Sequence, residues 1–451
     1  MTDLLKNYEN VKTEFEQTHF KILSPLLFAE IRDNGILLLR NKTEFSNVYE
    51  NKHFEKVYFD SEGRKIKRHS LIKDWLKDQN IRTYDSIDFL PMQQTPDKVY
   101  NTFKNYAGAN LPQTKKIDIK KTKIYEHINN LCNNNKDVVD YFIKFLARKL
   151  QQPGRLTNTC LIFRSSEGCG KDTFFNWFGN SILGRNYYLN EDKINLIFGR
   201  FNSCIENKIL VIVNETCGKD TMEMMSSIKN AITRNVNLIE IKGLSPYNNT
   251  NNIGYICLTN NKNSMRIDAE DRRFCAIECN NTIANNHEYF TALHVEMADP
   301  IITRAFYDYF MSINVATYDF TANRPITEFH SSMKEISVPI IVRFLEQEVN
   351  HNLINNIKVK KYTRLYEHLT TFLSHSQIKY DISEAKFGRD VKEFTCITKK
   401  RSNKGIVYCV DFILLQQYLI EKYKIENYTT LELTEMTELN SQCVWWATHT
   451  S

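Results

Sequence analysis

Uninterrupted apolar runs alternate with helical periodicity in the middle of the chain. The apolar runs lie at residues 159–164, 208–213 and 253–258. Segments whose apolar residues have helical spacing lie at 137–153, 171–183 and 221–233. Continuous apolar strands separated by helices are typical of a parallel sheet that helices cover on both faces. We therefore predict an α/β domain over residues 116–330.

The segment before this domain mixes both kinds of pattern. Residues 35–40 and 56–59 are predicted strands, and residues 70–78 have the apolar spacing of a short amphipathic helix. Three prolines between residues 91 and 112 break the pattern, and a lysine-rich run follows at 114–123. We expect an N-terminal α/β domain over residues 1–115, with the lysine-rich run as a solvated linker.

The pattern changes again after residue 331. Segments with helical spacing lie at 338–349, 363–375 and 383–394. A hairpin candidate follows over residues 396–410, with Gly405 at the end of its turn. Three helices and a β-hairpin are the components of a winged-helix domain, so we expect a winged-helix-like domain over residues 331–425. Residues 426–451 are predicted to form a peripheral polar tail.

Composition narrows the class of protein. The 451 residues carry a net charge of +6, and 42% of them are hydrophobic, which excludes wholesale disorder. No run approaches the ~18 apolar residues of a membrane span, and the charged N-terminus lacks the apolar core of a secretory signal. The 11 cysteines form no CxxC pair or Cys/His cluster, so we predict neither a zinc site nor disulfides. We expect a soluble intracellular protein with no membrane partner.

Glycine is scarce, and its distribution indicates where the chemistry lies. Six of the 14 glycines fall within residues 154–199. A strand, a glycine-containing loop, a lysine and a helix N-terminus together bind nucleotide phosphates, because backbone N–H groups face the phosphates and the lysine reaches them. The residues predicted in this way to bind ATP are Glu167, Gly168, Cys169, Gly170, Lys171, Asp172 and Thr173.

This loop departs from the common GxxxxGK[ST] pattern at both ends. Ser165 stands in place of the first glycine, and Asp172 stands in place of the hydroxyl residue that binds magnesium. Thr173, one position later, supplies a hydroxyl, and we predict that it binds Mg²⁺. The alternative interpretation is a Gly–Lys turn that only caps a helix.

Polar residues follow the next two apolar runs. Asn214 and Glu215 come directly after residues 208–213, and Asn260 comes two positions after residues 253–258. Ligands bind at the carboxyl edge of parallel sheets. We predict that Glu215 positions or deprotonates the attacking water, that Asn214 and Glu215 bind Mg²⁺, and that Asn260 bonds the γ-phosphate or that water. The alternative for Glu215 is an exposed carboxylate at a strand end.

Basic residues elsewhere provide candidate contacts to phosphate groups. One of Arg272 and Arg273 is predicted to reach the ATP of a neighbouring subunit. Lys242 lies at the tip of a predicted hairpin between the second and third apolar runs, where we expect it to contact a DNA backbone. The predicted wing of the C-terminal domain carries three more candidate DNA contacts, which are Lys399, Lys400 and Arg401. A solvated turn is the alternative for that group.

Several motifs together resemble those of viral superfamily 3 helicases. In chain order they are SSEGCGKDTFF, FGRFN, ILVIVNE, IEIKG, ICLTNN and DRRF. The chain looks most like the poxvirus-type and phage-type primase-helicase ATPases of viruses, phages and mobile elements, over about residues 140–280. Those proteins are AAA+ ring helicases. The resemblance therefore implies an AAA+-type P-loop ATPase core and a hexameric ring that translocates on single-stranded DNA.

The resemblance also implies roles for single residues. These are Walker A for Lys171 and Thr173, Walker B for Glu215, sensor 1 for Asn260, the DNA-translocating lysine for Lys242 and the arginine finger for Arg272 or Arg273. It implies ATP and Mg²⁺ as cofactors and a separate primase or polymerase as partner. A virus- or mobile-element-encoded protein that acts at replication sites in its host cell is expected.

Three functions stay open at this point. The first is an ATP-dependent replicative DNA helicase. The second is a non-catalytic nucleotide- and DNA-binding assembly module, because Asp172 and Asn214 both depart from the common residues at magnesium positions. The third is a nucleoside monophosphate kinase, which also uses a GKDT loop but needs an arginine-rich lid. Only about 120 residues precede the predicted ATPase and they show no paired-carboxylate strand motif, so we expect no primase activity.

Overall fold

The computed structural model divides the chain into two compact units. The first comprises residues 1–264 with 272–327, and the second comprises residues 265–271 with 328–451. The residues that the structure describes are 7–32, 37–61, 63–113, 117–214, 221, 223–242, 246–261, 265, 267–268, 270–376, 382–402 and 405–423.

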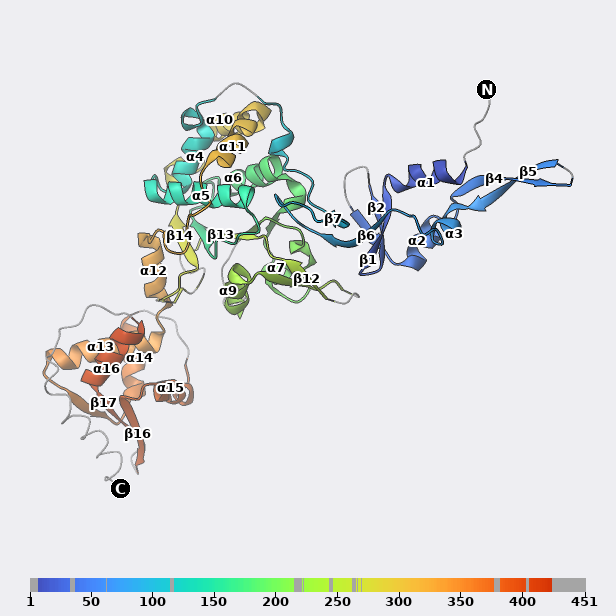
Figure 1. Ribbon diagram of the computed structural model, residues 1–451. Coiled ribbons are helices and arrows are strands. Elements are labelled where there is room, and N and C mark those ends of the chain that lie inside the picture. Colours follow the sequence, from blue (N-terminus) through green and yellow to red (C-terminus); the bar gives the residue numbers. More distant parts are fainter. Residues whose placement is uncertain are drawn as a thin grey trace. The chain divides into compact units, whose positions relative to one another are not determined.

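The N-terminal part of the first unit is a mixed sheet with short helices (Figure 1). Its strands are β1 (His19–Ser24), β2 (Leu27–Ile31), β3 (Leu37–Arg40), β6 (Thr83–Asp88) and β7 (Val99–Asn101), and its helices are α1 (Tyr8–Glu16), α2 (Lys42–Val48) and α3 (Leu71–Trp75). The strand order is β3-β2-β1-β6-β7, with β1 antiparallel to β2 and parallel to β6. Phe15, Phe28, Phe45 and Trp75 form an aromatic core between the helices and the sheet.

Two further strands of this part form a separate two-stranded ribbon. They are β4 (His53–Asp60) and β5 (Gly63–Ser70), which pair antiparallel along their whole length. The ribbon contacts α1 and α3 at its base. There Phe54 is buried in the aromatic core.

The central part of the first unit contains a five-stranded parallel sheet. Its strands are β8 (Cys160–Arg164), β9 (Tyr188–Glu191), β10 (Leu210–Val213), β13 (Gly254–Thr259) and β14 (Phe274–Glu278). The strand order is β14-β8-β13-β10-β9, and every neighbouring pair is parallel. In chain order the strands therefore lie as 5-1-4-3-2, so the strand that precedes Asn260 lies between those that precede the glycine loop and Asn214.

Helices and a hairpin complete this part. The helices are α4 (Lys123–Leu131), α5 (Lys136–Gln151), α6 (Lys171–Trp177), α7 (Ile194–Phe198), α9 (Met225–Thr233), α10 (His287–Ala298) and α11 (Pro300–Ser312). The hairpin consists of β11 (Val236–Ile239) and β12 (Tyr247–Thr250), which pair antiparallel between α9 and β13. A π-helical turn over Phe178–Gly184 continues α6.

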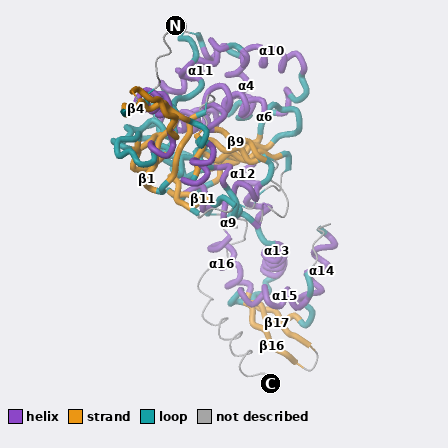
Figure 2. Tube along the Cα trace, turned by 90° about the vertical axis from the view of Figure 1, so that its right-hand side faces the viewer, coloured by secondary structure: helices purple, strands orange, loops and turns teal. Residues whose placement is uncertain are grey.

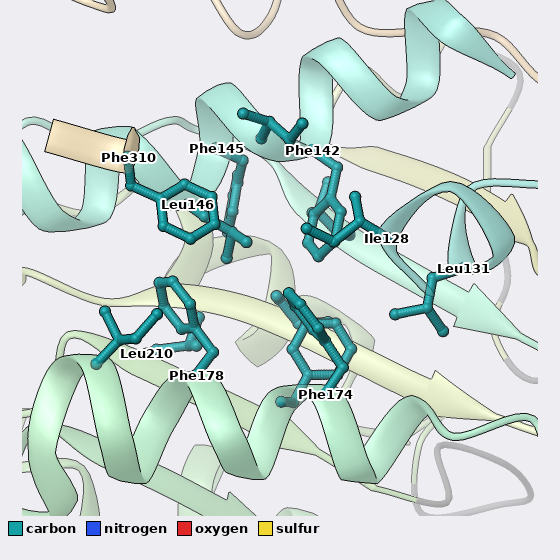
Figure 3. Close-up of a cluster of buried hydrophobic side chains, with 14 of the residues drawn as sticks. Ile128, Leu131, Phe142, Phe145, Leu146, Phe174, Phe178, Leu210 and Phe310 are labelled. Atoms are coloured by element: carbon teal, nitrogen blue, oxygen red, sulfur yellow. The ribbon is translucent and has the colours of Figure 1, made fainter. Parts of the chain in front are cut away.

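An aromatic layer fixes α5 and α6 on one face of the sheet (Figure 3). The ring centroid of Phe142 on α5 lies 5.0 Å from that of Phe163 on β8 and 5.7 Å from that of Phe174 on α6. On the other face, the ring of Tyr255 on β13 lies 5.4 Å from Phe198 on α7. Because side chains alternate between the faces of a strand, helices cover both faces, as the continuous apolar runs predict.

The longest helix beside this sheet shows why the sequence folds as it does. The Asn135 side chain accepts hydrogen bonds from the backbone N–H groups of Asp137 and Val138, which otherwise lack partners at the start of α5. Apolar residues with a 3.6-residue period then turn to the core, and Phe142 is fully buried. The helix ends two residues before Pro153, because proline cannot continue a helix.

The second unit is a small helical domain with a three-stranded sheet (Figure 2). Its helices are α12 (Glu328–Ser337), α13 (Ile340–Ile354), α14 (Leu365–His375), α15 (Glu384–Asp390) and α16 (Phe412–Tyr423). Its strands are β15 (Val359–Tyr362), β16 (Ile397–Ser402) and β17 (Gly405–Asp411), in the antiparallel order β15-β17-β16. The three predicted helices and the predicted hairpin are present. The structure adds β15, α12 and α16.

Most elements predicted in the central part are also present, but β9 was missed. Four residues are too few for a periodicity argument. The predicted C-terminal tail over residues 426–451 lies outside the described residues. None of the described helices has the length and apolar character needed to cross a membrane.

Candidate functional site

A glycine loop (residues 165–170) connects the end of β8 to the start of α6. Gly168 and Gly170 have φ angles of 76° and 83°, which residues with a Cβ adopt only with strain. A Cβ on Gly168 would lie 2.2 Å from Oδ1 of Asn285, and one on Gly170 would lie 2.5 Å from a ring carbon of Phe290. Both glycines are therefore required by this backbone path.

A cavity of about 750 Å³ opens at the carboxyl edge of the parallel sheet above this loop. All residues from 167 to 173 line it, as do Asn214 and Asn260. The structure thus brings together, in one cavity, the predicted ATP-binding residues and two residues that follow separate strands. Asn176, Asn190 and Asp192 also line the cavity and were not singled out by the sequence.

Lys171 links the glycine loop to the neighbouring strand. Its Nζ donates a hydrogen bond of 3.0 Å to Oδ1 of Asn260 and another to Oγ of Ser165. Burial lowers the pKa of Lys171 from its ordinary value. Among the described residues no carboxylate forms an ion pair with this ammonium group. A buried cation with neutral partners favours the arrival of an anion.

A chain of hydrogen-bonded amide side chains forms one wall of the cavity. Nδ2 of Asn214 donates to Oδ1 of Asn190 at 2.5 Å. Nδ2 of Asn190 in turn lies 3.2 Å from Oδ1 of Asn176 and 3.4 Å from Oδ1 of Asp172. Because its NH₂ group is engaged, Asn214 presents its carbonyl oxygen as an acceptor. Asp172 supplies a carboxylate to the same wall.

Several side chains that line the cavity are of the chemical types that bind Mg²⁺. Mg²⁺ takes oxygen ligands, commonly one or two carboxylates together with waters and phosphate oxygens. Asp172, Thr173 and Asn214 offer a carboxylate, a hydroxyl and an amide oxygen in one cavity. Relative to the common pattern, a carboxylate (Asp172) stands in the first turn of α6 and an amide (Asn214) stands at the strand end. Within the described part of the chain, no cluster of three or more His, Cys, Asp or Glu residues could hold a metal.

A histidine supports the glycine loop from behind. His127 on α4 is fully buried, with Nε2 3.1 Å from the carbonyl oxygen of Gly170 and Nδ1 3.1 Å from the Tyr289 hydroxyl. The carbonyl only accepts, so Nε2 carries the proton and Nδ1 accepts from Tyr289. Nδ2 of Asn130 donates to that hydroxyl at 3.2 Å. Burial lowers the pKa of His127 to about 4, so the ring is neutral near pH 7.

The segment after β14 holds the rest of the loop. Oδ1 of Asn281 accepts hydrogen bonds of 2.9 Å from the backbone N–H and the hydroxyl of Ser166. The carbonyl of Gly168 accepts from the backbone N–H of Asn285 at 3.2 Å. The Cys169 thiol donates to the carbonyl of Asn280 at 3.4 Å. These hydrogen bonds tie Ser166, Gly168 and Cys169 to residues 280–285.

The two arginines lie at the other edge of the sheet. Arg272 and Arg273 immediately precede β14, and the carbonyl of Arg273 accepts a hydrogen bond of 2.7 Å from the N–H of Cys160 at the start of β8. The five residues of β8 separate that edge from the glycine loop by about 15 Å, at ~3.3 Å per residue. The structure therefore does not bring these arginines to the cavity of their own chain.

The candidate DNA contacts lie outside the cavity. Lys242 is exposed in the loop between β11 and β12, of which residues 243–245 lie outside the described part. Lys399 and Arg401 alternate with Lys400 along β16, so the three cations are divided between the two faces of the strand. Nζ of Lys399 lies 5.6 Å from the ring centroid of Tyr408.

Glu215, the predicted catalytic carboxylate, lies outside the described residues, which stop at Asn214 and resume at Thr221. Its role stays a prediction. The sequence analysis missed Asn190, Asp192 and His127 for two different reasons. Asn190 lies in a strand that was not recognised, and Asp192 directly follows that strand. His127 lies in a helix about 40 residues before the loop, where no local pattern relates the two.

Comparisons with known proteins support the fold. The model of a family of unknown function, DUF5906, matches residues 163–273, from β8 to the residue before β14. No curated protein matches the chain. The chain is similar to the apo structure of the NrS-1 C terminal region (305–718), with a TM-score of 0.59 and 16% identity over 91% of this chain and 99% of that one. The A form apo structure of the same region gives 0.59 and 16%, covering 89% and 98%. At this identity the likeness establishes a shared fold.

Proposed function

We propose that this chain is an ATP-driven DNA helicase of viral or mobile-element replication that works as a ring. One observation carries the proposal. Lys171 follows a loop in which two glycines have positive φ angles, and it donates a hydrogen bond to Asn260 at the end of the neighbouring strand β13. Both residues line a cavity that Asp172, Thr173 and Asn214 also line. That arrangement suits a nucleoside triphosphate, whose phosphates need a cation, backbone N–H groups and Mg²⁺ together.

The strand order supports the choice of an AAA+ motor over other phosphate-binding proteins. In the AAA+ proteins that the sequence resembles, the strand carrying sensor 1 lies between the Walker A and Walker B strands. Here β13, which precedes Asn260, lies between β8 and β10. A nucleoside monophosphate kinase needs an arginine-rich lid instead, and none of the described residues that line this cavity is an arginine.

We assign parts in hydrolysis to residues that line the cavity and to Glu215. Lys171 holds the β- and γ-phosphates, and Asn260 orients the γ-phosphate or the attacking water. Glu215, which follows Asn214 in the chain, accepts the proton of that water. Asp172, Thr173 and Asn214 would hold Mg²⁺, which neutralises phosphate charge when it is bound.

The placement of the arginines supports action between subunits. Arg272 and Arg273 lie at the sheet edge remote from the glycine loop of their own chain. An arginine there stabilises transition-state charge only in the cavity of a neighbouring copy. Head-to-tail contacts of this kind form a ring when the rotation between copies closes. Lys242 in the exposed β11–β12 loop would then follow the DNA backbone, and the winged-helix-like second unit would add affinity.

Steady-state ATP hydrolysis with and without single-stranded DNA tests the proposal. We expect DNA-stimulated turnover in the wild type. Lys171→Ala should lose nucleotide binding, whereas Glu215→Gln should keep it and lose at least about 100-fold in turnover. Mixing inactive Arg272→Ala/Arg273→Ala chains into the wild type should reduce activity more steeply than dilution.

Two results would favour the alternatives. Nucleotide binding without turnover in the wild type would indicate a non-catalytic assembly module, which the unusual residues Asp172 and Asn214 motivate. Transfer of the γ-phosphate to a nucleoside monophosphate, without DNA stimulation, would indicate a kinase.

A further inference from the structure

The β4–β5 ribbon has no part in the cavity or in the proposed motor. It has its own two-stranded sheet, and only its base is fixed, through Phe54 in the aromatic core. Beyond Phe54 its side chains are largely exposed; Ile66, for example, is 52% exposed. In Figure 1 the ribbon extends away from α1 and α3. An isolated two-stranded hairpin is marginally stable in water. A bound partner would therefore stabilise a ribbon of this length.

The charges on the ribbon point to an anionic partner. Residues 52–70 contain six Lys or Arg residues against three Asp or Glu residues. The register places Lys56 directly opposite Lys67. Like charges at directly opposed positions destabilise a strand pair. Both side chains are exposed, and within the described part of the chain neither forms an ion pair with a carboxylate. An anion bound between them would remove this repulsion.

An aromatic ring lies on the same face. Tyr58 is two residues from Lys56 and is paired with Lys65, so its ring lies beside the two opposed lysines. Nζ of Lys56 is 5.8 Å from the ring centroid. The ring is 36% exposed, and its hydroxyl is hydrogen-bonded to Nε2 of His69, which restrains its orientation. Cations that flank an exposed, oriented aromatic ring are the components with which proteins bind single-stranded nucleic acids.

We propose that this face of the ribbon binds single-stranded nucleic acid without sequence preference. Lys56 and Lys67 contact successive phosphates, and Tyr58 stacks against a base. The proposal is independent of ATP hydrolysis, of Lys242 and of the second unit. A protein partner is the less favoured occupant, because the face combines cations with one aromatic ring and has no contiguous apolar surface.

The test is a titration of fluorescently labelled oligothymidylate and of a labelled duplex with the full chain, without nucleotide, over a series of salt concentrations. Each phosphate contact on a single strand contributes about 0.7 to the slope of log affinity against log salt. Lys56→Gln/Lys67→Gln should therefore lower the slope by about 1.4 and weaken single-strand binding about 25-fold in ~0.1 M salt. Lys42→Gln/Lys73→Gln, two exposed lysines outside the ribbon, is the matched control and should bind as the wild type does.

A second variant separates stacking from charge. Tyr58→Leu should weaken single-strand binding at least about fivefold, with no change of salt slope and no effect on duplex binding. Wild-type affinity and slope in the paired lysine variant would overturn the proposal. The proposal would also be overturned if the paired lysine variant kept its DNA binding but changed its oligomeric state in sedimentation. The ribbon would then join copies of the chain. Both variants should retain the wild-type ATPase rate without DNA. If the wild type hydrolyses no ATP, that result counts against the proposed helicase and not against the ribbon site.

Discussion

The neutral state of His127 leads to a quantitative prediction about stability. A pKa lowered from 6.5 to about 4 by burial corresponds to about 3 kcal/mol between the folded and unfolded chains. Because the folded pKa lies below the unfolded one, this stabilisation is complete above pH 6.5 and is lost as the pH falls toward 4. His127→Gln keeps a donor for the carbonyl of Gly170 but does not titrate. The free energy of unfolding should therefore fall by about 3 kcal/mol more in the wild type than in His127→Gln between pH 7 and pH 4.

The assay is a urea titration at each pH, read by pulsed hydrogen–deuterium exchange of peptides from α4 and α6. Taking the difference between the two proteins cancels the other groups that titrate in this range. His287→Gln, at the exposed first position of α10, is the control and should follow the wild type. Equal losses of stability in the wild type and His127→Gln would refute the buried, neutral histidine.

The same residue gives a functional prediction. His127→Leu removes the hydrogen bond to Gly170 and leaves the carbonyl with only the first helical bond from Phe174, 3.2 Å long. We expect ATP affinity to fall about tenfold, in line with the 1–3 kcal/mol cost of a lost buried hydrogen bond. The value of kcat should change less, because His127 positions the loop and does not touch the γ-phosphate. His127→Gln should retain the affinity. A fall in kcat with unchanged affinity would contradict a positioning role.

Three further outcomes follow from the cavity. Asp172→Asn should weaken magnesium-dependent nucleotide binding about 10- to 100-fold, measured by calorimetry with and without Mg²⁺. Asp172→Thr/Asn214→Asp should restore binding, and no recovery would contradict the role of Asp172 as the carboxylate that replaces one at the strand end. Gly168→Ala should cost at least about 1 kcal/mol in thermal denaturation, and adding Asn285→Ala should recover only the steric part. Lys242→Ala should abolish the stimulation of ATP hydrolysis by DNA and leave the basal rate intact. A change in the basal rate alone would contradict a role of Lys242 in DNA contact.

Local patterns predicted the central part of the chain well because its strands are buried on both faces. Apolar runs such as residues 208–213 and 253–258 have the same pattern in any register. Asn214 and Asn260, which follow these runs, line the cavity because parallel strands end at one edge. The same argument applied to β9 would have found Asn190. That strand has four residues with only Tyr188 buried, so its pattern is too weak.

Other features depend on contacts that sequence spacing does not carry. His127 reaches Gly170 across 43 positions, and Asn281 reaches Ser166 across 115. The opposed lysines of the β4–β5 ribbon become visible only once the register is known. The sequence indicated residues 56–59 as a strand but gave no sign of its partner, because β5 has no alternation of buried and exposed residues.

Unwinding of a forked DNA duplex by the wild type and by Glu215→Gln tests the central claim most directly. The account predicts that the wild type separates the strands only with both ATP and Mg²⁺, and only on forks with one kind of single-stranded arm, either 3′ or 5′. Glu215→Gln should separate none, although it still binds nucleotide. Failure to separate either type of fork, under conditions in which single-stranded DNA stimulates ATP hydrolysis, would contradict a helicase.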